Sequence, residues 1–329
     1  MNFYTWDSVI NLLIYILINF VLVIILSPFF MILIKKIKAF TQRRNGPPLL
    51  QGYYQIIKLF KKEVIYSSNS SIIIKISPYI NIAVILLASL SLPIVYIPNG
   101  MGGMGNIILF IYLLALAKFF MVLGGYDAGS TFGGMGSSRE MSLSALVEPL
   151  LIVIFAALVF VLGTTDIFLI FSTSAMCSNH LFNENLSCSN YLFAFPIFFA
   201  LFIVLIAETS RIPVDNPETH LELTMVHEAM ILEQSGRNLA LMELSSGIKQ
   251  TLFLILIINI FFPWGLTIKF DIILILLGIL LFIIKGVVLV VLVALFESSG
   301  AKMRLFKIPT LFAFALFFSL ITIALAILA

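Results

Sequence analysis

The sequence has little charge and almost no cysteine. Only 11% of its 329 residues are charged, against about 25% in soluble domains, while 61% are hydrophobic and the mean hydropathy is +1.14. A chain this poor in charge cannot cover itself with a polar surface in water, so lipid must be its main solvent. Two cysteines, Cys177 and Cys188, are too few for the four thiolates of an iron–sulfur cluster. We therefore expect no cofactor bound by this chain.

The small net charge of +3 also speaks against nucleic-acid binding, because the cations cluster in connections between apolar runs. Met1 to Asp7 contains no basic residue, and the apolar run that follows is long enough to span a bilayer, so we expect no secretory signal.

Long apolar runs dominate the chain. A bilayer-spanning helix needs roughly 20 consecutive apolar residues. The sequence predicts an all-α integral membrane protein, one polytopic domain over residues 1–329 with about eight transmembrane helices. Their expected bounds are Val9–Ile34, Ile76–Tyr96, Ile107–Gly125, Leu143–Leu162, Tyr191–Ala207, Gln250–Thr267, Ile272–Phe296 and Ile308–Leu328.

The positive charge is distributed very unevenly between the two sides. Sixteen of the 19 Lys and Arg residues lie in the odd-numbered connections, Lys269 alone lies on the opposite side, and Lys118 and Lys285 fall inside spans. Cytoplasmic connections carry the excess of cations, so we expect both termini outside. Cys177 and Cys188 then share an outward connection, as a disulfide or as two thiols.

The first connection contains an amphipathic segment at residues 49–65. Leu49, Tyr53, Ile56, Phe60 and Val64 recur at helical spacing, with glutamines and lysines on the other face. This pattern predicts a helix on the cytoplasmic membrane surface. It is either a surface anchor or one wall of a cavity or docking platform.

The third connection is rich in glycine and leads into charged residues. Residues 124–136 carry six glycines, which permit tight turns and close approach of another chain. Arg139 and Glu140 follow, and Glu148 lies about one and a half turns into the fourth span. An acid at that depth is paired, protonated or facing water. Pairing with Lys118 or Lys285 and a role in proton handling are compatible explanations.

The fifth connection, at about residues 208–249, is acidic. Seven of the 16 acidic residues lie between Glu208 and Glu243. Glu218 and Glu222 share one helical face, and like charges in close quarters raise one another's pKa, which suits proton exchange. His220 and His227 match no standard zinc spacing, so we expect no metal site.

These residues resemble a known family. The pattern Glu208-x-x-Arg211-x-Pro213-x-Asp215-x-Pro217-Glu218-x-x-x-Glu222 is similar to the signature of the NuoH family, the subunit that links the quinone chamber of respiratory complex I to its membrane arm. Arg139 and Glu148 resemble that family's third-loop arginine and fourth-span glutamate. The resemblance covers nearly the whole chain.

Finer details resemble the branch found in group 4 energy-converting [NiFe] hydrogenases, which includes formate hydrogenlyase and hydrogenase-4. Residues 46–54, 132–140, 221–233 and 296–306 carry this likeness. Two positions depart from the complex I pattern. His220 stands where complex I usually has a further glutamate, and Gln234 stands where it has tyrosine.

The resemblance implies a non-catalytic membrane subunit that anchors a peripheral arm and couples its redox chemistry to proton or sodium movement. Hydrogenase-like large and small subunits and antiporter-like membrane subunits are the implied partners, and iron–sulfur clusters with a nickel–iron or quinone site are implied on them. The implied coupling residues are Glu140, Glu148, Glu208, Asp215, Glu218, Glu222, Lys118 and Lys285, with Arg139 and Arg211 orienting the acids.

Two alternatives remain. The first is the quinone-chamber subunit of NADH:quinone oxidoreductase, with a lipid-soluble quinone entering beneath the amphipathic helix. The second is a stand-alone secondary transporter, although such proteins often contain internal repeats and the sequence shows no matching halves.

Overall fold

The computed structural model describes residues 6–68, 70–97, 105–172, 191–216, 225–268 and 270–328. These residues form helices and two isolated β-bridges, which confirms the all-α membrane fold. In chain order the helices are α1 (Trp6–Thr41), α2 (Gln51–Phe60), α3 (Ile73–Ser89), α4 (Ile107–Asp127), α5 (Thr131–Leu162), α7 (Tyr191–Glu208), α8 (His227–Ile231), α9 (Gly236–Phe261), α10 (Ile272–Ser299), η1 (Leu305–Lys307) and α11 (Ile308–Leu328).

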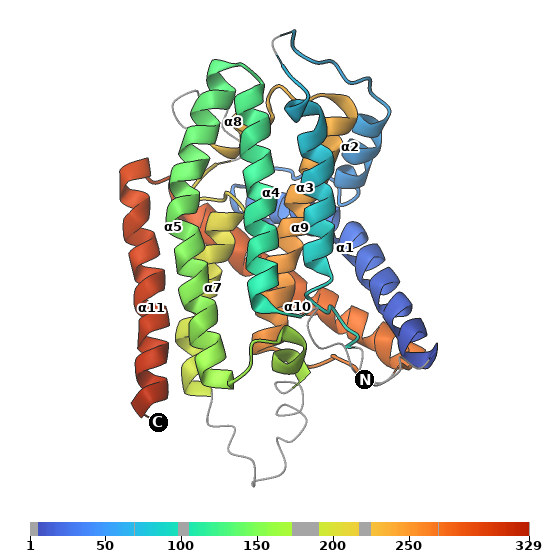
Figure 1. Ribbon diagram of the computed structural model, residues 1–329, viewed down its shortest axis with the longest axis vertical. Coiled ribbons are helices and arrows are strands. Elements are labelled where there is room, and N and C mark those ends of the chain that lie inside the picture. The colour runs from blue at the N-terminus through green and yellow to red at the C-terminus, as the bar shows by residue number, and fades with distance from the viewer. Residues whose placement is uncertain are drawn as a thin grey trace.

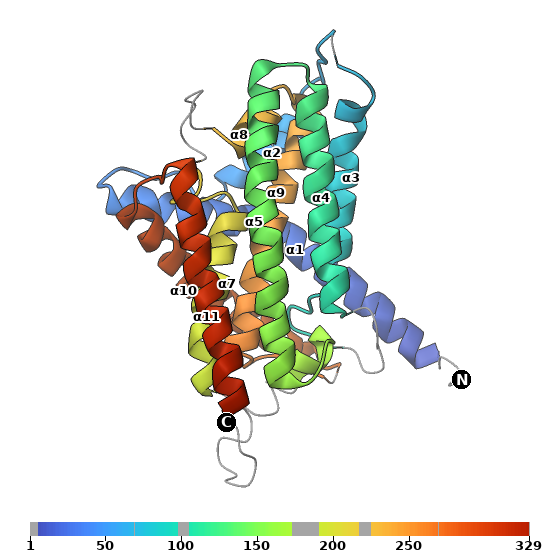
Figure 2. The same ribbon diagram turned by 60° about the vertical axis from the view of Figure 1, so that its left-hand side comes forward.

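The long helices form one bundle. Figure 1 and Figure 2 show α3, α4 and α5 upright and side by side, with α1 and α10 strongly inclined. The start of α1 and the end of α11 lie at the same end of the bundle, opposite α2 and α8 (Figure 1). Within the described ranges, six helices are long and apolar enough to cross a membrane, while α3 and the described part of α7 are apolar but shorter. The count of eight spans stays a prediction.

Helix α9 occupies the middle of the bundle. It packs against α1, α2, α3, α7 and α10, and its second half is almost entirely buried. It begins at Gly236, 14 residues before the predicted span, and polar side chains along it such as Asn238 and Gln250 are buried in the protein interior. The helix therefore extends beyond the apolar run from which the span is predicted.

Helix α5 likewise begins before the predicted span, at Thr131, whereas the span is predicted from Leu143. The hydroxyl of Ser130 accepts a hydrogen bond from the Gly133 amide at 3.1 Å and caps the helix. Much of the glycine-rich stretch is thus helical. The segment that approaches these glycines closely is α8 of the same protein. A Cβ added at Gly136 would lie 2.8 Å from Ala229 Cβ.

Helix α3 ends seven residues before the predicted bound and is followed by a buried extended segment. Pro93 cannot continue a helix, so the backbone needs other partners inside the protein. Asn19 Nδ2 donates to Leu92 O at 3.1 Å, and Asn259 Nδ2 donates to Pro93 O at 2.6 Å. The segment then pairs with Thr267, whose amide donates to Val95 O at 2.8 Å. Side-chain amides thus replace the helical ladder here.

Helix α2 confirms the predicted amphipathic helix and forms a wall of a cavity. Gly52 seats it on α1, and the Tyr53 hydroxyl donates to Ile25 O at 2.5 Å. Burial raises the pKa of the Tyr53 phenol above its usual value.

We expect Gly52→Ala to loosen α2 from α1. An added Cβ would lie 2.8 Å from Ile32 Cγ1 and 3.1 Å from Pro28 O, so the helix must shift at a cost of about 1–3 kcal/mol. Thermal unfolding of the purified protein and proteolysis of the 42–68 connection measure the effect. Gly134→Ala is the control, because no atom lies within 4 Å of its added Cβ and helix propensity favours alanine by about 1 kcal/mol. Equal stabilisation by both changes would show that Gly52 is not a packing contact.

Candidate functional site

A cavity of about 160 Å³ lies between α1, α2, α3, α4, α7 and α9, with α5, α8 and the end of α10 at its border. Its lining combines buried apolar side chains with an unusual number of charged ones. The charged and imidazole residues are Lys35, Lys38, Lys118, Glu140, Glu208, Arg211, His227, Glu228, Glu243, Lys249 and Glu297. Buried charges are costly unless they are paired, so the pairing defines the site.

Glu208 forms the first buried cluster. Its side chain is 2% exposed, and its two oxygens lie 2.8 Å from Lys118 Nζ on α4 and 2.5 Å from Lys249 Nζ on α9. The charges of Glu140 and Glu148 also act on Lys118. Lys118 therefore pairs directly with Glu208, at the end of α7, and lies within electrostatic range of two carboxylates on α5.

The end of α7 explains why Glu208 and Arg211 are held firmly. The Arg211 amide donates to Ile206 O at 3.0 Å and the Ser210 amide to Ala207 O at 3.2 Å, the two bonds of a Schellman motif. Ser210 takes the left-handed position with φ of 50°, where glycine is usual. The motif sends the chain sideways immediately after Glu208, and the Ile212–Pro213 peptide bond that follows is cis.

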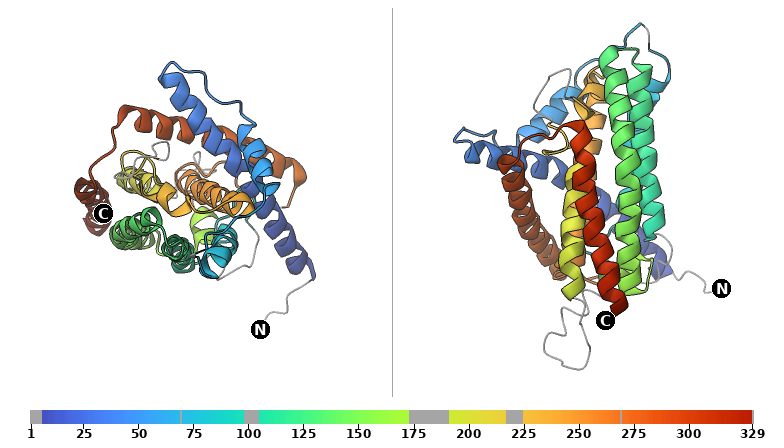
Figure 3. Two further views of the ribbon diagram at one scale, coloured as in Figure 1. Left: turned by 90° about the horizontal axis from the view of Figure 1, so that it is seen from above. Right: turned by 90° about the vertical axis from the view of Figure 1, so that its left-hand side faces the viewer.

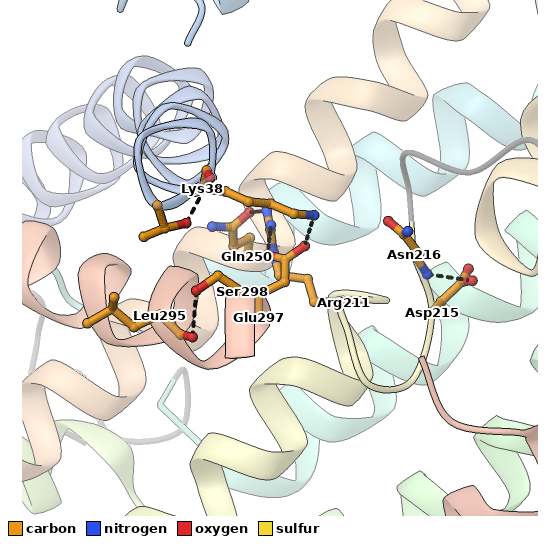
Figure 4. A network of polar contacts seen from close by, with 9 residues as sticks. Lys38, Arg211, Asp215, Asn216, Gln250, Leu295, Glu297 and Ser298 are labelled. Carbon is orange, nitrogen blue, oxygen red and sulfur yellow. Dashed lines mark hydrogen bonds and ion pairs between the residues drawn. The ribbon is translucent and has the colours of Figure 1, made fainter. Parts of the chain in front are cut away.

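Glu297, at the end of α10, forms the second cluster. Its carboxylate lies 2.9 Å from Lys38 Nζ and 3.1 Å from Arg211 Nη1, and Arg211 Nη2 donates to Gln250 Oε1 at 2.8 Å. Figure 4 shows these side chains converging from α1, α9, α10 and the fifth connection. The cluster therefore ties four segments that are distant in sequence.

Asp215 forms the third pair. Its Oδ1 lies 2.5 Å from Lys302 Nζ, and its Oδ2 accepts a hydrogen bond from the His227 amide at 3.2 Å. The Asn216 amide also donates to Asp215 Oδ1, at 2.8 Å. Asp215 thus joins the fifth connection to the seventh and to the start of α8.

The structure brings together part of the predicted set. Glu140, Glu208, Lys118 and Arg211 line the cavity, and Asp215 adjoins it in the fifth connection. Glu148 lies on α5 two turns beyond Glu140, about 12 Å along the helix axis. Glu218, Glu222, His220 and both cysteines lie outside the described residues.

Other predicted residues lie elsewhere or have other partners. Lys285 lies near the far end of α9, where its ammonium group donates to Phe262 O at 2.7 Å and to Trp264 O, so it is not part of the cavity. Arg211 pairs with Glu297, which was outside the predicted acid set. Arg139 donates to Met225 O at 2.9 Å and so supports the start of α8.

Sequence reasoning missed four charged residues: Glu297, Lys38, Lys249 and Lys302. The three lysines were counted as cations of the cytoplasmic connections, whereas Lys38 and Lys249 lie inside α1 and α9 with their charges in buried pairs. Glu297 occurs in the 296–306 stretch that carries the branch resemblance. Its position, an acidic residue at the end of an apolar helix, is the sequence signal that could have identified Glu297 as a site residue.

The fold and the buried pairs define a class: a multi-pass membrane protein with a charged cavity at one end of its bundle. Comparison with known proteins is more specific. The NADH dehydrogenase family model matches residues 12–329, and the chain belongs to this family.

Two relatives from Escherichia coli K12 cover most of the chain. Hydrogenase-4 component C is 33% identical over 293 residues, 89% of each chain. Formate hydrogenlyase subunit 4 is 33% identical over 290 residues, 86% of this chain and 91% of the relative. NADH-ubiquinone oxidoreductase chain 1 of Chondrus crispus is 29% identical over 256 residues, 72% of each.

A solved structure has the same fold. A chain of the membrane-bound sulfane sulfur reductase, described as an archaeal respiratory membrane complex, superposes with a TM-score of 0.76 at 16% identity, covering 96% of this chain and 99% of that one. The protein is thus homologous to membrane subunits of hydrogenase-4, formate hydrogenlyase and complex I.

Proposed function

We propose that this chain is the membrane anchor and ion-coupling subunit of an energy-converting, hydrogenase-type complex of the cell inner membrane. The names of its relatives support the hydrogenase branch, and the resemblance in four sequence stretches agrees with it. In this proposal both termini face outward and the cavity faces the cytoplasm. Iron–sulfur clusters and the nickel–iron site belong to partner subunits, since two cysteines cannot ligate a cluster.

The observation that carries the proposal is the position of Lys118. Its ammonium group pairs with Glu208 at 2.8 Å and interacts electrostatically with the carboxylates of Glu140 and Glu148. When either α5 carboxylate takes up a proton, its attraction for Lys118 weakens, and the Lys118–Glu208 ion pair dominates. When that proton is lost, the α5 carboxylate attracts Lys118 again. A redox event that changes charge near the cavity is thereby coupled to protonation deeper in α5.

The second candidate is the quinone-chamber subunit of NADH:quinone oxidoreductase, which the cavity beneath α2 favours. Copurification separates the two. A nickel–iron large subunit with ferredoxin-like small subunits supports the hydrogenase assignment, whereas flavin-containing, NADH-oxidising subunits support complex I. Activity as a lone transporter in liposomes would contradict both.

We expect Glu148→Gln and Glu222→Gln each to reduce ion translocation while leaving the complex assembled, because an amide keeps the side-chain shape but cannot exchange a proton. Translocation is measured in inverted membrane vesicles, and assembly by copurification. Glu63→Gln, at an exposed acid on the cavity-side connection, is the control. Normal translocation in both variants would rule out the proposed carboxylate route.

A further inference from the structure

A second, open groove lies on the outer face of α1. It has a volume of about 310 Å³ and is lined by Leu33, Lys36, Ile37, Phe40 and Leu49. The four α1 residues recur at helical spacing and so share one face. Phe40 is 82% exposed, so the groove offers an uncovered aromatic ring beside the exposed Lys36.

This groove is separate from the central cavity. Ile34 and Lys38, on another face of the same helix turns, are buried and line the cavity, where Lys38 pairs with Glu297. Lys36 is exposed and forms no ion pair with any residue in the described ranges. Seen from above in Figure 3, the end of α1 extends past α10 to the edge of the molecule. Lys36 and Phe40, both exposed, open the groove to the surroundings.

The sequence around the groove is strongly one-sided in charge. Residues 8–62 contain eight Lys and Arg residues and no acidic residue. Those exposed at and just beyond the end of α1, and not lining the central cavity, are Lys36, Arg43 and Arg44. Any occupant therefore meets a positive field, which favours an anion.

The groove also lies where the apolar run of α1 gives way to cations. α1 has 36 residues, about 54 Å of helix, and so exceeds the roughly 30 Å of a hydrocarbon core. Its apolar run ends at Ile34, and Lys35 and Lys36 follow. Cations at this depth lie at the level of lipid headgroups.

We propose that this groove binds an anionic phospholipid, with its phosphate against Lys36, an acyl chain beside Leu33, and Ile37, Phe40 and Leu49 packed around the glycerol region. A water-soluble anionic partner would leave Phe40 and Ile37 uncovered. An apolar protein surface would leave the Lys36 ammonium buried without a counter-charge, which is costly. A phospholipid satisfies both requirements. The bound lipid holds the end of α1, the helix that carries Lys38 to Glu297 on its other face.

The first test measures lipid binding to the purified complex in nanodiscs of phosphatidylcholine, with phosphatidylglycerol added and retained lipid counted by native mass spectrometry. We expect selective retention of phosphatidylglycerol and roughly fivefold weaker binding in Lys36→Gln, the effect of one basic residue at an anionic surface. Lys58→Gln, the same charge change on the exposed face of α2, is the matched control and should bind as the wild type does. Equal losses in both variants, or equal retention of the two lipids, would overturn the proposal.

The second test identifies what covers the groove in native membranes. A photoreactive phenylalanine analogue in place of Phe40 should crosslink to phospholipid in the intact complex. The same analogue at Tyr54, an exposed aromatic of α2 outside the groove, is the control position. A crosslink from position 40 to a protein subunit would show that the groove is a protein interface and would overturn the lipid assignment.

Discussion

Glu208→Gln is expected to reduce ion translocation by roughly tenfold or more and to destabilise the protein. Glu208 holds Lys118 and Lys249 at once, and removing one partner of a buried pair costs about 3–5 kcal/mol. Since each 1.4 kcal/mol is a factor of ten in an equilibrium constant, this loss is large enough that Lys118 interacts with Glu140 and Glu148 alone. The lysine then no longer exchanges between the two sides. Translocation in inverted vesicles and thermal unfolding in detergent measure the two effects.

A double variant separates stability from coupling. Glu208 with its two lysines carries a net charge of +1, and Glu208→Gln combined with Lys249→Met leaves Lys118 alone with the same net charge. We expect the double variant to regain much of the lost stability but not the translocation. If it regains both, Glu208 acts only through charge balance. If Glu208→Gln translocates as the wild type does, the coupling role of Glu208 is wrong.

Glu297→Ala is expected to destabilise the protein by about 3–5 kcal/mol, because Lys38 and Arg211 lose the buried carboxylate that pairs with both of them. Both cations come from segments distant from α10 in sequence, so their release frees the end of α1 and the fifth connection together. Thermal unfolding measures the loss, and protease sensitivity of residues 209–216 reports the freed connection.

The control for Glu297 is Glu63→Ala, at an exposed acid, where a change within about 0.5 kcal/mol is expected. A compensating pair strengthens the test. Lys38→Met with Glu297→Gln removes one charge of each sign, and Arg211 then retains amide oxygens at positions 250 and 297 as acceptors. This pair should be more stable than Glu297→Ala. Equal loss in both would show that packing at the helix end, and not ion pairing, determines the effect.

The sequence was sufficient for features whose signal is local. Apolar runs predicted the long helices, and apolar residues at helical spacing within residues 49–65 predicted α2, which spans Gln51–Phe60. A helix can be longer than its apolar run where it turns polar side chains toward other protein, as α9 does with Asn238. Hydropathy indicates which residues are apolar enough to face lipid. It therefore does not predict the bounds of a helix that is surrounded by protein.

The site was predicted only in part because ion pairing is not a local property. Glu208 and Asp215 were found from a short motif. Their cations, and the whole Glu297 cluster, come from distant segments: Lys38 is 259 residues from Glu297, and Lys118 is 90 from Glu208. No spacing rule connects such residues. A lysine that ends an apolar run looks the same in sequence whether it faces water or a buried carboxylate.

The central position of α9 has a consequence for how the protein is made. This helix is the least apolar of the six long ones and carries Glu243 and Lys249 in its length. A charged residue near the centre of a helix costs about 2.5–3.5 kcal/mol during insertion into the bilayer. We therefore expect α9 to insert against α1, α3 and α7, which precede it in the chain and pack against it, rather than against lipid. Synthesis from the N-terminus supplies those helices in that order.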